Sequence, residues 1–470
     1  MRILIHGINF YPEPVGTGKY TGEMAMWLAS RGHQVRVVTS PPHNPQWRVL
    51  RGWSSWKYSR ERISVPEFSA ANSSSALPPA EIMVFRCPIW VPSRPNGLKR
   101  LIYLASFGMS SFGKILLQFS WQPDLILLIE PTLFCSFQVL VLSSCSSAKT
   151  WLHVQDFEVD AAFKLDDFSS SWICRCVLYF ERMLLSRFDR VSSISDRMVD
   201  RLKSKGVDES RCVLFPNWVK NEEIRPLLRP SVFRQELSID KNTVVALYSG
   251  SMGKKQGLEL LAEAARRLTN RTDLHFVFCG DGSYRQVLAD MVKDLPNVTV
   301  LPLQPPELLN ELLNLADIHL LPQRADAADL VMPSKLTGML ASGRPVVVTA
   351  DPGTQLEQVV MGKGLVVAPG DLDGFVAAIL QLTSDNDLRT RLGCEARKYS
   401  LAHLDWCRTL SAFERAILSL CDNFSNDDEH DRELSASPSG EKQVARNANQ
   451  PGITKTQVAN DYECRISTDH

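Results

Sequence analysis

Residues 249–257 read Ser-Gly-Ser-Met-Gly-Lys-Lys-Gln-Gly and directly follow a short apolar run. Gly250 and Gly253 let backbone N–H groups approach a ligand closely, and Lys254 and Lys255 bring positive charge. A segment of helical period comes next, so the unpaired N–H groups of a helix start lie beside the lysines. These features favour a binding site for a diphosphate over the alternative, a solvated turn. The segment is not a P-loop, because it lacks the Gly-Lys-Ser/Thr ending.

Two further segments have groups suited to binding an anion. Ser334 and Lys335 open an apolar helical stretch with a hydroxyl, a cation and free N–H groups, which predicts a second anion site. Gly282 lies in a glycine-rich turn after another apolar run. Its main predicted role is to form this turn, and contact with a ligand is a secondary one.

Gly16 and Gly18 occupy a loop between the first apolar run, residues 2–6, and a helical stretch. Glycines in this place let the backbone approach a ligand, although a tight turn explains them equally well. The dinucleotide fingerprint needs a third glycine at the position of Thr21. A nicotinamide-dependent enzyme is therefore disfavoured.

A histidine and acidic residues gather at the end of another apolar run. His153 ends the run, and Asp156 and Glu158 follow it. Such a group at the end of a strand can act in acid–base catalysis. The alternative is a structural histidine, which is the more common role of a lone histidine.

Short apolar runs alternate with segments of helical period, a pattern that predicts βα units and parallel sheets. The predicted strands are residues 2–6, 35–39, 124–129, 150–154 and 190–194 in a first series, and 244–249, 275–279, 298–301, 318–321, 346–349 and 364–367 in a second. Residues 41–79 are rich in Pro, Ser and Trp and are predicted to form a long irregular loop. Two such series fit a pair of α/β, Rossmann-like domains that face each other across a cleft.

The predicted division of the chain follows its composition. Residues 1–218 form the first domain and residues 219–422 the second, which includes closing C-terminal helices. Three prolines and several charges make residues 216–230 a hinge between the domains. Residues 423–470 are polar and poor in hydrophobic residues, which predicts a disordered tail.

Composition excludes several other classes of protein. Lysine plus arginine equals aspartate plus glutamate at 52 each, which argues against a nucleic-acid binder. The eleven cysteines contain no CxxC pair, so neither a zinc site nor a disulfide framework is expected. The N-terminus reads as a strand and not as a signal peptide, and charged residues and glycines interrupt the apolar stretch at 98–119 before it reaches a spanning length of about 18–20 residues.

Taken in order, these segments resemble the retaining GT-B glycosyltransferases of family 4, and within them the fucosyltransferases of colanic acid synthesis. The resemblance spans residues 1–420. The segments that carry it are residues 7–13, 16–24, 41–47, 130–135, 153–161, 216–219, 250–258 and 332–336. One of these motifs alone would mean little, whereas so many in the same order are specific.

The resemblance implies the GT-B fold and a role for each candidate residue. His153 lies near the reacting sugar, and Lys254 and Lys255 neutralise the leaving diphosphate. The donor is held by Gly16, Gly18, Gly250, Gly253, Gly282, Leu303, Ser334 and Lys335, with Leu303 near the base. The acceptor side of the first domain has Glu130, Asp156 and Glu158.

Two departures from the family pattern concern the donor site. Family 4 usually has two glutamates with seven residues between them in the second domain, and the matching positions are Leu330 and Gly338. A frequent arginine after the first glycine is Ser251. Subgroup character accounts for the missing pair, and more of the cationic role then falls to the two lysines.

The function implied by the resemblance is a retaining, metal-independent transfer of fucose from GDP-fucose to a growing, lipid-linked exopolysaccharide. The nucleotide sugar is a substrate, and no cofactor or metal is expected. A cytoplasmic protein is expected, with residues 98–119 resting on the inner face of the membrane or, alternatively, forming a core helix. Two other functions stay open: an N-acetylaminosugar transferase or epimerase of the same fold, and a catalytically silent protein that binds nucleotides or glycans.

Overall fold

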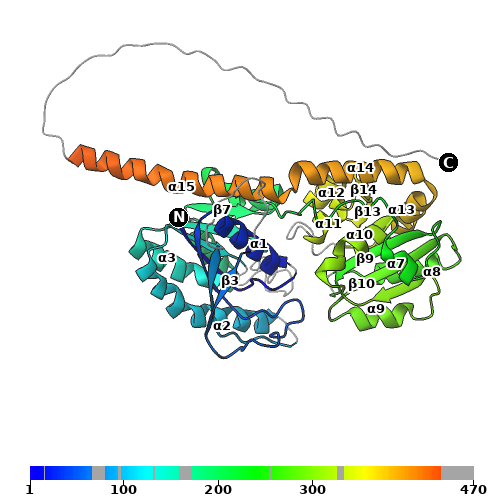
Figure 1. Ribbon diagram of the computed structural model, residues 1–470, viewed down its shortest axis with the longest axis horizontal. Coiled ribbons are helices and arrows are strands. Elements are labelled where there is room, and N and C mark those ends of the chain that lie inside the picture. Colours follow the sequence, from blue (N-terminus) through cyan, green and yellow to red (C-terminus); the bar gives the residue numbers. More distant parts are fainter. Residues whose placement is uncertain are drawn as a thin grey trace, which may run out of the picture. The chain divides into compact units, whose positions relative to one another are not determined.

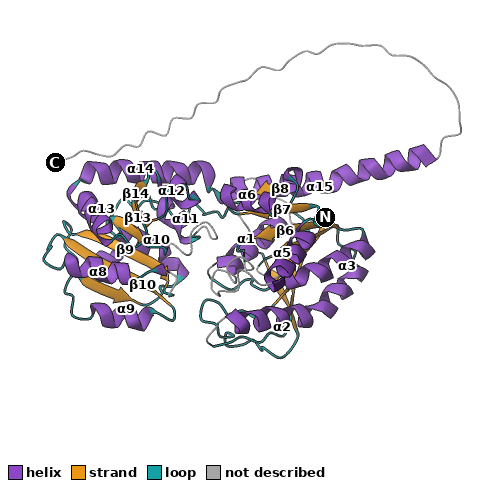
Figure 2. Cartoon of the chain, turned by 180° about the vertical axis from the view of Figure 1, so that it is seen from behind, coloured by secondary structure: helices purple, strands orange, loops and turns teal. Residues whose placement is uncertain are grey.

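The computed structural model describes residues 1–14, 16–65, 80–93, 97–130, 133–157, 172–253, 256–324 and 333–435. Met1–Asp422 form one compact unit, and Asn423–His470 form a second. Two separate sheets make up the large unit, and each has its own order of strands (Figures 1 and 2).

Eight strands form the first sheet in the described part of the chain, in the order β3-β4-β2-β1-β5-β6-β7-β8. Their bounds are β1 Arg2–Gly7, β2 Gln34–Thr39, β3 Ser59–Ser64, β4 Glu81–Arg86, β5 Leu125–Ile129, β6 Lys149–Val154, β7 Arg190–Ser193 and β8 Cys212–Leu214. All neighbours are parallel except β3, which pairs with β4 in the antiparallel sense. β1 and β5 at the centre are buried almost throughout, as expected for a sheet covered on both faces.

Six parallel strands form the second sheet in the order β11-β10-β9-β12-β13-β14. Their bounds are β9 Val244–Ser251, β10 Leu274–Asp281, β11 Val298–Leu301, β12 Ile318–Leu321, β13 Val346–Thr349 and β14 Gly364–Val367. The strands predicted from apolar runs are therefore confirmed in both series, and the chain has the α/β fold of two Rossmann-like sheets that the sequence predicts.

Helices cover the faces of both sheets. Those of the first half are α1 Gly16–Ser30, α2 Gly97–Leu116, η1 Leu117–Trp121, η2 Leu133–Cys135, α3 Ser136–Ser146, α5 Trp172–Leu185, α6 Asp196–Ser204 and η3 Glu209–Arg211. Those of the second are α7 Val232–Glu236, α8 Glu259–Arg267, α9 Arg285–Val292, η5 Pro306–Leu308, α10 Leu309–Leu315, α11 Lys335–Ala341, α12 Gln355–Val360, α13 Leu372–Ser384 and α14 Asn386–His403. On the first sheet, for example, α1 buries Tyr20, Met24 and Leu28 beside Ile3 and Val35.

The predicted irregular loop at 41–79 is wrong in part, because β3 lies inside it. The sequence of β3 is Ser-Arg-Glu-Arg-Ile-Ser, and its side chains are mostly exposed. An edge strand of this kind has no apolar run, and its charges protect the free edge from other strands. β4 and β8 also escape prediction. β4 lies between β3 and β2, and β8, with three residues, forms the other edge of the sheet.

The last helix, α15 Trp406–Ser435, follows the second sheet but packs on the first. Its apolar residues recur at helical spacing and enter the core of the first sheet: Trp406, Leu410, Phe413, Ile417 and Leu420. The prediction that residues up to 422 belong to the second domain is therefore wrong for this helix. Its period of apolar residues is clear in the sequence, but nothing there says which sheet receives it. The helix also runs to Ser435, whereas a tail without regular structure is predicted from residue 423.

The chain crosses between the sheets twice at one place. Val219 and Asp405 form an isolated parallel bridge, in which the Val219 N–H donates to the Leu404 carbonyl at 2.8 Å and the Trp406 N–H donates to the Val219 carbonyl at 3.2 Å. The two crossings thus support each other, and this point lies within the hinge predicted at residues 216–230.

Helix α2 is more continuous than the sequence analysis expects. Residues Lys99–Trp121 are long and apolar enough to cross a membrane by length and composition, and a third of the most apolar window is buried in the protein. Tyr103, Leu104 and Phe107 belong to the core of the first sheet. A partly buried core helix of a protein can also be long and apolar enough to meet these criteria.

Three buried histidines predict a loss of stability in acid. Burial lowers the pKa of His6 to about 4 and the pKa values of His153 and His319 to about 3, against an ordinary value of 6.5. The folded chain keeps these rings neutral, so their contribution is complete above pH 6.5 and falls as the pH drops, because the unfolded chain then takes up protons. Below pH 6.5, and down to its folded-state pKa, each of these histidines lowers the free energy of unfolding by about 1.4 kcal/mol per pH unit.

We expect the free energy of unfolding, measured with urea from pH 7.5 down to pH 5, to fall steeply. The variant His319→Asn removes one titrating group and should show a smaller slope, whatever its stability at pH 7.5. Equal slopes for the variant and the parent would contradict the assignment.

Candidate functional site

The carboxyl ends of parallel strands meet at one edge of a sheet, and ligands bind there in this class of fold. In the second sheet this edge has Gly250 in the last residues of β9, Gly253 after β9, Gly282 after β10 and Leu303 after β11. The structure therefore brings most of the predicted donor-binding residues to a single edge. Lys254 and Lys255 lie outside the described residues.

Lys335 is a cation at this edge that contacts the side chain of a β9 residue. It starts α11, and its Nζ donates a hydrogen bond to the Tyr248 hydroxyl at 2.9 Å and lies 4.2 Å from the centre of the Tyr248 ring. The Tyr248 hydroxyl in turn donates to the Ser251 carbonyl at 2.5 Å. Within the ranges that the structure describes, no carboxylate forms an ion pair with Lys335. Burial without a counter-charge lowers the pKa of Lys335 to about 7.

Gly250 is required by its own backbone conformation, and it lies beside Lys335. Its φ is +129°, and a Cβ atom there would lie 3.4 Å from the Cδ atom and 3.5 Å from the Nζ atom of Lys335. A glycine therefore keeps the backbone of the β9 turn directly beside the ammonium group. An anion bound at this turn would meet backbone and lysine together.

Other glycines of this edge serve the fold. A Cβ atom on Gly282 would lie 2.8 Å from the carbonyl carbon of Met252, so this glycine lets the turns after β9 and β10 touch. The Gly253 N–H donates to the Gln256 side chain at 3.0 Å and is not left for a ligand. Leu303 is 38% exposed in the loop after β11.

A contact joins this edge to α1, whose first turn contains Gly16 and Gly18, the glycines predicted to lie in a loop. The Tyr20 hydroxyl on α1 donates to the Ser334 carbonyl at 3.5 Å. Gly16, at the start of α1, has a φ of +61° and open space around its Cα. The predicted loop of the first sheet thus reaches the neighbourhood of Ser334 and Lys335.

Packing requires a glycine at position 18, for a reason that the sequence does not show. A Cβ atom on Gly18 would lie 2.7 Å from the Cβ atom of Glu13, which is 2% exposed. Glycine is needed here so that Glu13 can enter the protein beneath α1. The role predicted for Gly18 in binding the donor is not needed to explain it.

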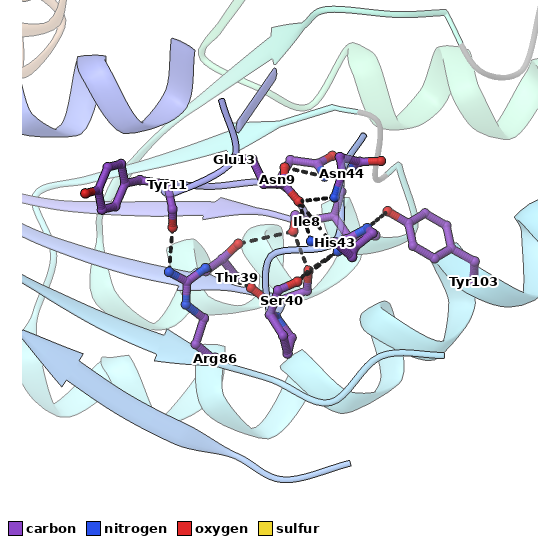
Figure 3. Close-up of polar contacts among 11 residues, drawn as sticks. Ile8, Asn9, Tyr11, Glu13, Thr39, Ser40, His43, Asn44, Arg86 and Tyr103 are labelled. Atoms are coloured by element: carbon purple, nitrogen blue, oxygen red, sulfur yellow. Dashed lines mark hydrogen bonds and ion pairs between the residues drawn. The ribbon is translucent and has the colours of Figure 1, made fainter. Parts of the chain in front are cut away.

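Glu13 organises the edge of the first sheet, as Figure 3 shows. One carboxylate oxygen accepts from the backbone N–H groups of His43 at 2.9 Å and Asn44 at 3.0 Å, and the other accepts from the Asn9 side chain at 3.0 Å. Three donors on one buried carboxylate tie the loop after β2 to the loop after β1. Glu13 is not among the site residues predicted from the sequence, where the one signal is an acidic residue between two prolines in a loop otherwise expected to bind anions.

His43 continues the network toward α2. Its Nδ1 lies 2.8 Å from the Pro41 carbonyl, which can only accept, so Nδ1 carries the proton. Nε2 then accepts from the Tyr103 hydroxyl at 2.8 Å (Figure 3). Arg86 closes the other side by donating to the carbonyl groups of Tyr11 at 2.5 Å and Ser40 at 3.0 Å.

His153 lies at the end of β6, as predicted, but it is almost fully buried. Nδ1 lies 2.9 Å from the Ser192 hydroxyl, and Nε2 lies 3.0 Å from the Gln155 amide nitrogen. The amide donates to Nε2, so Nδ1 carries the proton and donates to Ser192. Both ring nitrogens have protein partners and burial lowers the pKa to about 3. The ring is therefore suited to orienting neighbouring groups and not to taking a proton near neutral pH.

Of the three carboxylates predicted on the acceptor side, the structure describes two. Glu130 is 7% exposed at the end of β5, and its N–H donates to the His153 carbonyl at 2.9 Å. Asp156 is partly buried just after β6, and Glu158 lies outside the described residues. Among the described residues, no group of three His, Cys, Asp or Glu is placed to hold a metal ion.

Two family models match the chain. The "Glycosyl transferase 4-like domain" matches residues 15–218, and "Glycosyl transferases group 1" matches residues 231–399. The chain is 39% identical over 423 residues to WcaI of Escherichia coli (strain K12), which is named as a colanic acid biosynthesis glycosyl transferase. The alignment covers 88% of this chain and 98% of that protein.

Solved structures share the fold at low sequence identity. Sucrose-phosphate synthase from Thermosynechococcus elongatus superposes with a TM-score of 0.67 at 17% identity, covering 89% of this chain and 98% of that one. Anabaena Alr3699/HepE in complex with UDP and glucose gives a TM-score of 0.60 at 15% identity, covering 89% and 100%.

The Glu13 network predicts a local loss of order when the carboxylate is removed. Glu13→Ala leaves three donors without their acceptor, so we expect the free energy of unfolding to fall by about 2–4 kcal/mol. The backbone amides of His43 and Asn44 should exchange with deuterium faster than in the parent protein. Glu81→Ala is the control, because the exposed Arg62–Glu81 pair at 3.6 Å contributes about 1 kcal/mol or less. Unchanged exchange at residues 43 and 44 would show that Glu13 does not hold the loop.

Proposed function

The chain belongs to the family 4-like, group 1 glycosyltransferases, and from this premise we propose that it moves a sugar from a nucleotide-diphosphate donor to an exopolysaccharide acceptor. The observation that carries the proposal is Lys335, a cation without a carboxylate partner in the described residues, at the carboxyl edge of the second sheet. The name of WcaI supports colanic acid as the product, and the UDP and glucose bound to HepE support a nucleotide-sugar donor.

The donor we propose is GDP-fucose, the donor that the resemblance to the colanic acid fucosyltransferases implies. Its diphosphate would lie at Gly250 and Lys335, with Lys254 and Lys255 adding charge. The base would lie toward Leu303, the exposed residue at the β11 end of the same edge.

The reaction breaks the bond from the sugar C1 to the diphosphate oxygen and forms a bond from C1 to an acceptor hydroxyl oxygen. We place the proton of that hydroxyl on the leaving diphosphate, which leaves from the face that the acceptor attacks, so that the configuration is retained. Negative charge grows on the diphosphate as the bond breaks. We propose that Lys335, with the charges of Lys254 and Lys255, stabilises this charge most strongly at that stage, which lowers the barrier.

The absent glutamate pair changes how the donor ribose is held. Leu330 lies outside the described residues. Gly338 lies on α11, where a Cβ atom would come within 3.2 Å of the Leu313 side chain on α10. A side chain there would require the end of the Leu313 side chain to shift. Since neither position has a carboxylate, we propose that other groups of the edge hold the ribose, among them Ser334.

We propose a lipid-linked acceptor, on the basis of the face that α2 leaves uncovered. Leu101, Ile102, Met109 and Phe112 are 47%, 48%, 75% and 39% exposed, and at 100° per residue they fall within one arc of the helix. A face exposed to water normally carries polar residues. Residues 97–121 contain lysine and arginine but no acidic residue, so the helix suits an anionic lipid surface.

A donor screen tests the proposed function. We expect GDP-fucose to raise the unfolding temperature of the full chain more than UDP-glucose or dTDP-sugars do. The gain should be lost in Lys335→Met and in the double variant Lys254→Ala/Lys255→Ala. Lys293→Met, an exposed lysine after α9, is the matched control. No response to any nucleotide sugar would count against a transferase.

The pH dependence of donor affinity gives a finer test of Lys335. Because burial holds its pKa near 7 in the free protein, donor binding above pH 7 must be accompanied by proton uptake. Calorimetric affinity should be constant below pH 7 and then fall by up to about tenfold per pH unit. Lys335→Met should remove that pH dependence, and a parent protein with flat affinity would exclude Lys335 from the phosphate site.

Flotation with vesicles tests the membrane contact. The parent protein should bind vesicles of phosphatidylcholine with phosphatidylglycerol more strongly than pure phosphatidylcholine, and less strongly as salt rises. Leu101→Glu/Met109→Glu should abolish binding at an unchanged unfolding temperature, because both side chains are exposed. Val287→Glu, 44% exposed on α9, is the control. Vesicle binding that survives the double variant would place the contact elsewhere.

A further inference from the structure

A pocket of about 590 Å³ lies beside the first sheet, apart from the donor edge described above. Its walls come from the loops that follow β2 and β4. Three tryptophans line it, together with polar side chains: Trp47, Trp56, Trp90, Gln46, Arg48 and Ser93. Trp56 is 76% exposed, so a large aromatic surface faces water in the absence of a ligand.

The walls of the pocket are held by backbone hydrogen bonds. The Arg48 N–H donates to the His43 carbonyl at 3.1 Å, so the wall at Trp47 rests on the loop that Glu13 fixes. The Ile89 N–H donates to the Ser55 carbonyl at 2.9 Å and thereby joins the two loops. The pocket is therefore formed before a ligand arrives, which lowers the entropy cost of binding.

Aromatic contacts with Tyr103 and His43 fix the position of Trp47. Its ring lies 5.2 Å from the ring of Tyr103 and 6.5 Å from that of His43, and its φ is +52°. On the other wall, the Trp90 N–H donates to the Ser106 hydroxyl of α2 at 3.1 Å. Two of the three tryptophans are thus tied to the network of Figure 3 or to α2.

The chemistry of this lining suits a carbohydrate. The electron-rich face of an indole ring attracts the weakly positive C–H groups on the face of a sugar ring. Gln46, Arg48 and Ser93 offer hydrogen bonds to the hydroxyl groups at the sugar's rim. A purely apolar ligand would leave these polar groups without partners, and a free phosphate would make no use of the three indoles.

The location of the pocket indicates which position along the acceptor chain it binds. In the order β4-β2-β1-β5-β6, the end of β2 lies three strands from the end of β6 and His153, or about 14 Å at the usual strand spacing. Both ends are on the same edge, because β2, β1, β5 and β6 are parallel. A sugar in the pocket is therefore set apart from His153, near which the resemblance implies that the reacting sugar lies, yet close enough to belong to the same chain.

We propose that this pocket is an acceptor subsite that binds sugar residues of the growing oligosaccharide distant from the reacting hydroxyl. The proposal rests on the proposed function, because it presumes a saccharide acceptor. The pocket makes the enzyme sensitive to the length of the acceptor, since only a chain of several sugars spans both the pocket and the reaction centre.

Oligosaccharides of graded length from partial acid hydrolysis of colanic acid are the probe, with calorimetry on the full chain as the readout. We expect the longer oligosaccharides to bind more tightly than monosaccharides. Trp56→Ala should weaken the longer ones by roughly tenfold, at an unchanged unfolding temperature, and leave monosaccharides unaffected. Trp90→Ala should act in the same direction and Trp90→Phe less. Trp172→Ala is the matched control, a tryptophan that is 69% exposed on α5.

The outcomes separate this proposal from the function on which it rests. Equal binding of all lengths, or binding unchanged by both Trp56→Ala and Trp90→Ala, overturns the subsite. A parent protein that binds GDP-fucose but no oligosaccharide also overturns it and leaves the donor site intact. In turnover assays the subsite requires a higher KM for long acceptors in Trp56→Ala, with the KM for the donor unchanged. Failure of donor binding itself would instead count against the proposed function.

Discussion

The packing of α15 on the first sheet holds the two halves of the chain together. Phe413 of α15 stacks on Phe215 with a ring separation of 3.9 Å and meets Trp151 edge-on at 5.0 Å. Because α15 follows the second sheet in sequence, this contact returns the chain to the first sheet. The paired crossings at Val219 and Asp405 lie next to it. The contact between Tyr20 and Ser334 is a further link between the same two halves.

The two edges have different tasks, and their electrostatics differ accordingly. At the second sheet, Lys335 is a cation beside backbone, without a carboxylate partner in the described ranges. At the first sheet, two of the predominant buried polar groups have partners within the protein: Glu13 has three donors, and His153 uses both ring nitrogens. An edge with an unmet charge suits the binding of an anion, whereas a satisfied, rigid edge suits the orientation of a neutral substrate. This division agrees with a donor on one side and a saccharide on the other.

The sequence alone is enough to predict what depends on apolar runs and glycine turns. Buried strands such as β1 and β9, and the edge that collects Gly250 and Lys335, follow from such patterns. The polar edge strand β3 does not, because its pairing depends on β4 and not on its own side chains. Gly18 shows a second limit: its neighbour Glu13 is close in the sequence, but only the fold reveals that the carboxylate occupies the space of the missing Cβ. The neutral state of His153 likewise depends on its burial, which no local pattern identifies, as does its contact with Ser192 of β7.

Helix α2 links the proposed lipid contact to the proposed sugar pocket. The Ser110 hydroxyl donates to the Pro88 carbonyl at 2.5 Å, and the Tyr58 hydroxyl donates to the Ser110 carbonyl at 2.9 Å, so both loops around the pocket are fixed to this helix. Its inner face, with Leu104 and Phe107, anchors it in the core, while its outer face is apolar and exposed. One rigid element thus sets the distance between a membrane surface and the pocket. For an acceptor whose sugars are attached to a lipid, that fixed distance selects how many sugars reach the pocket, which gives a physical basis for counting residues in a growing chain.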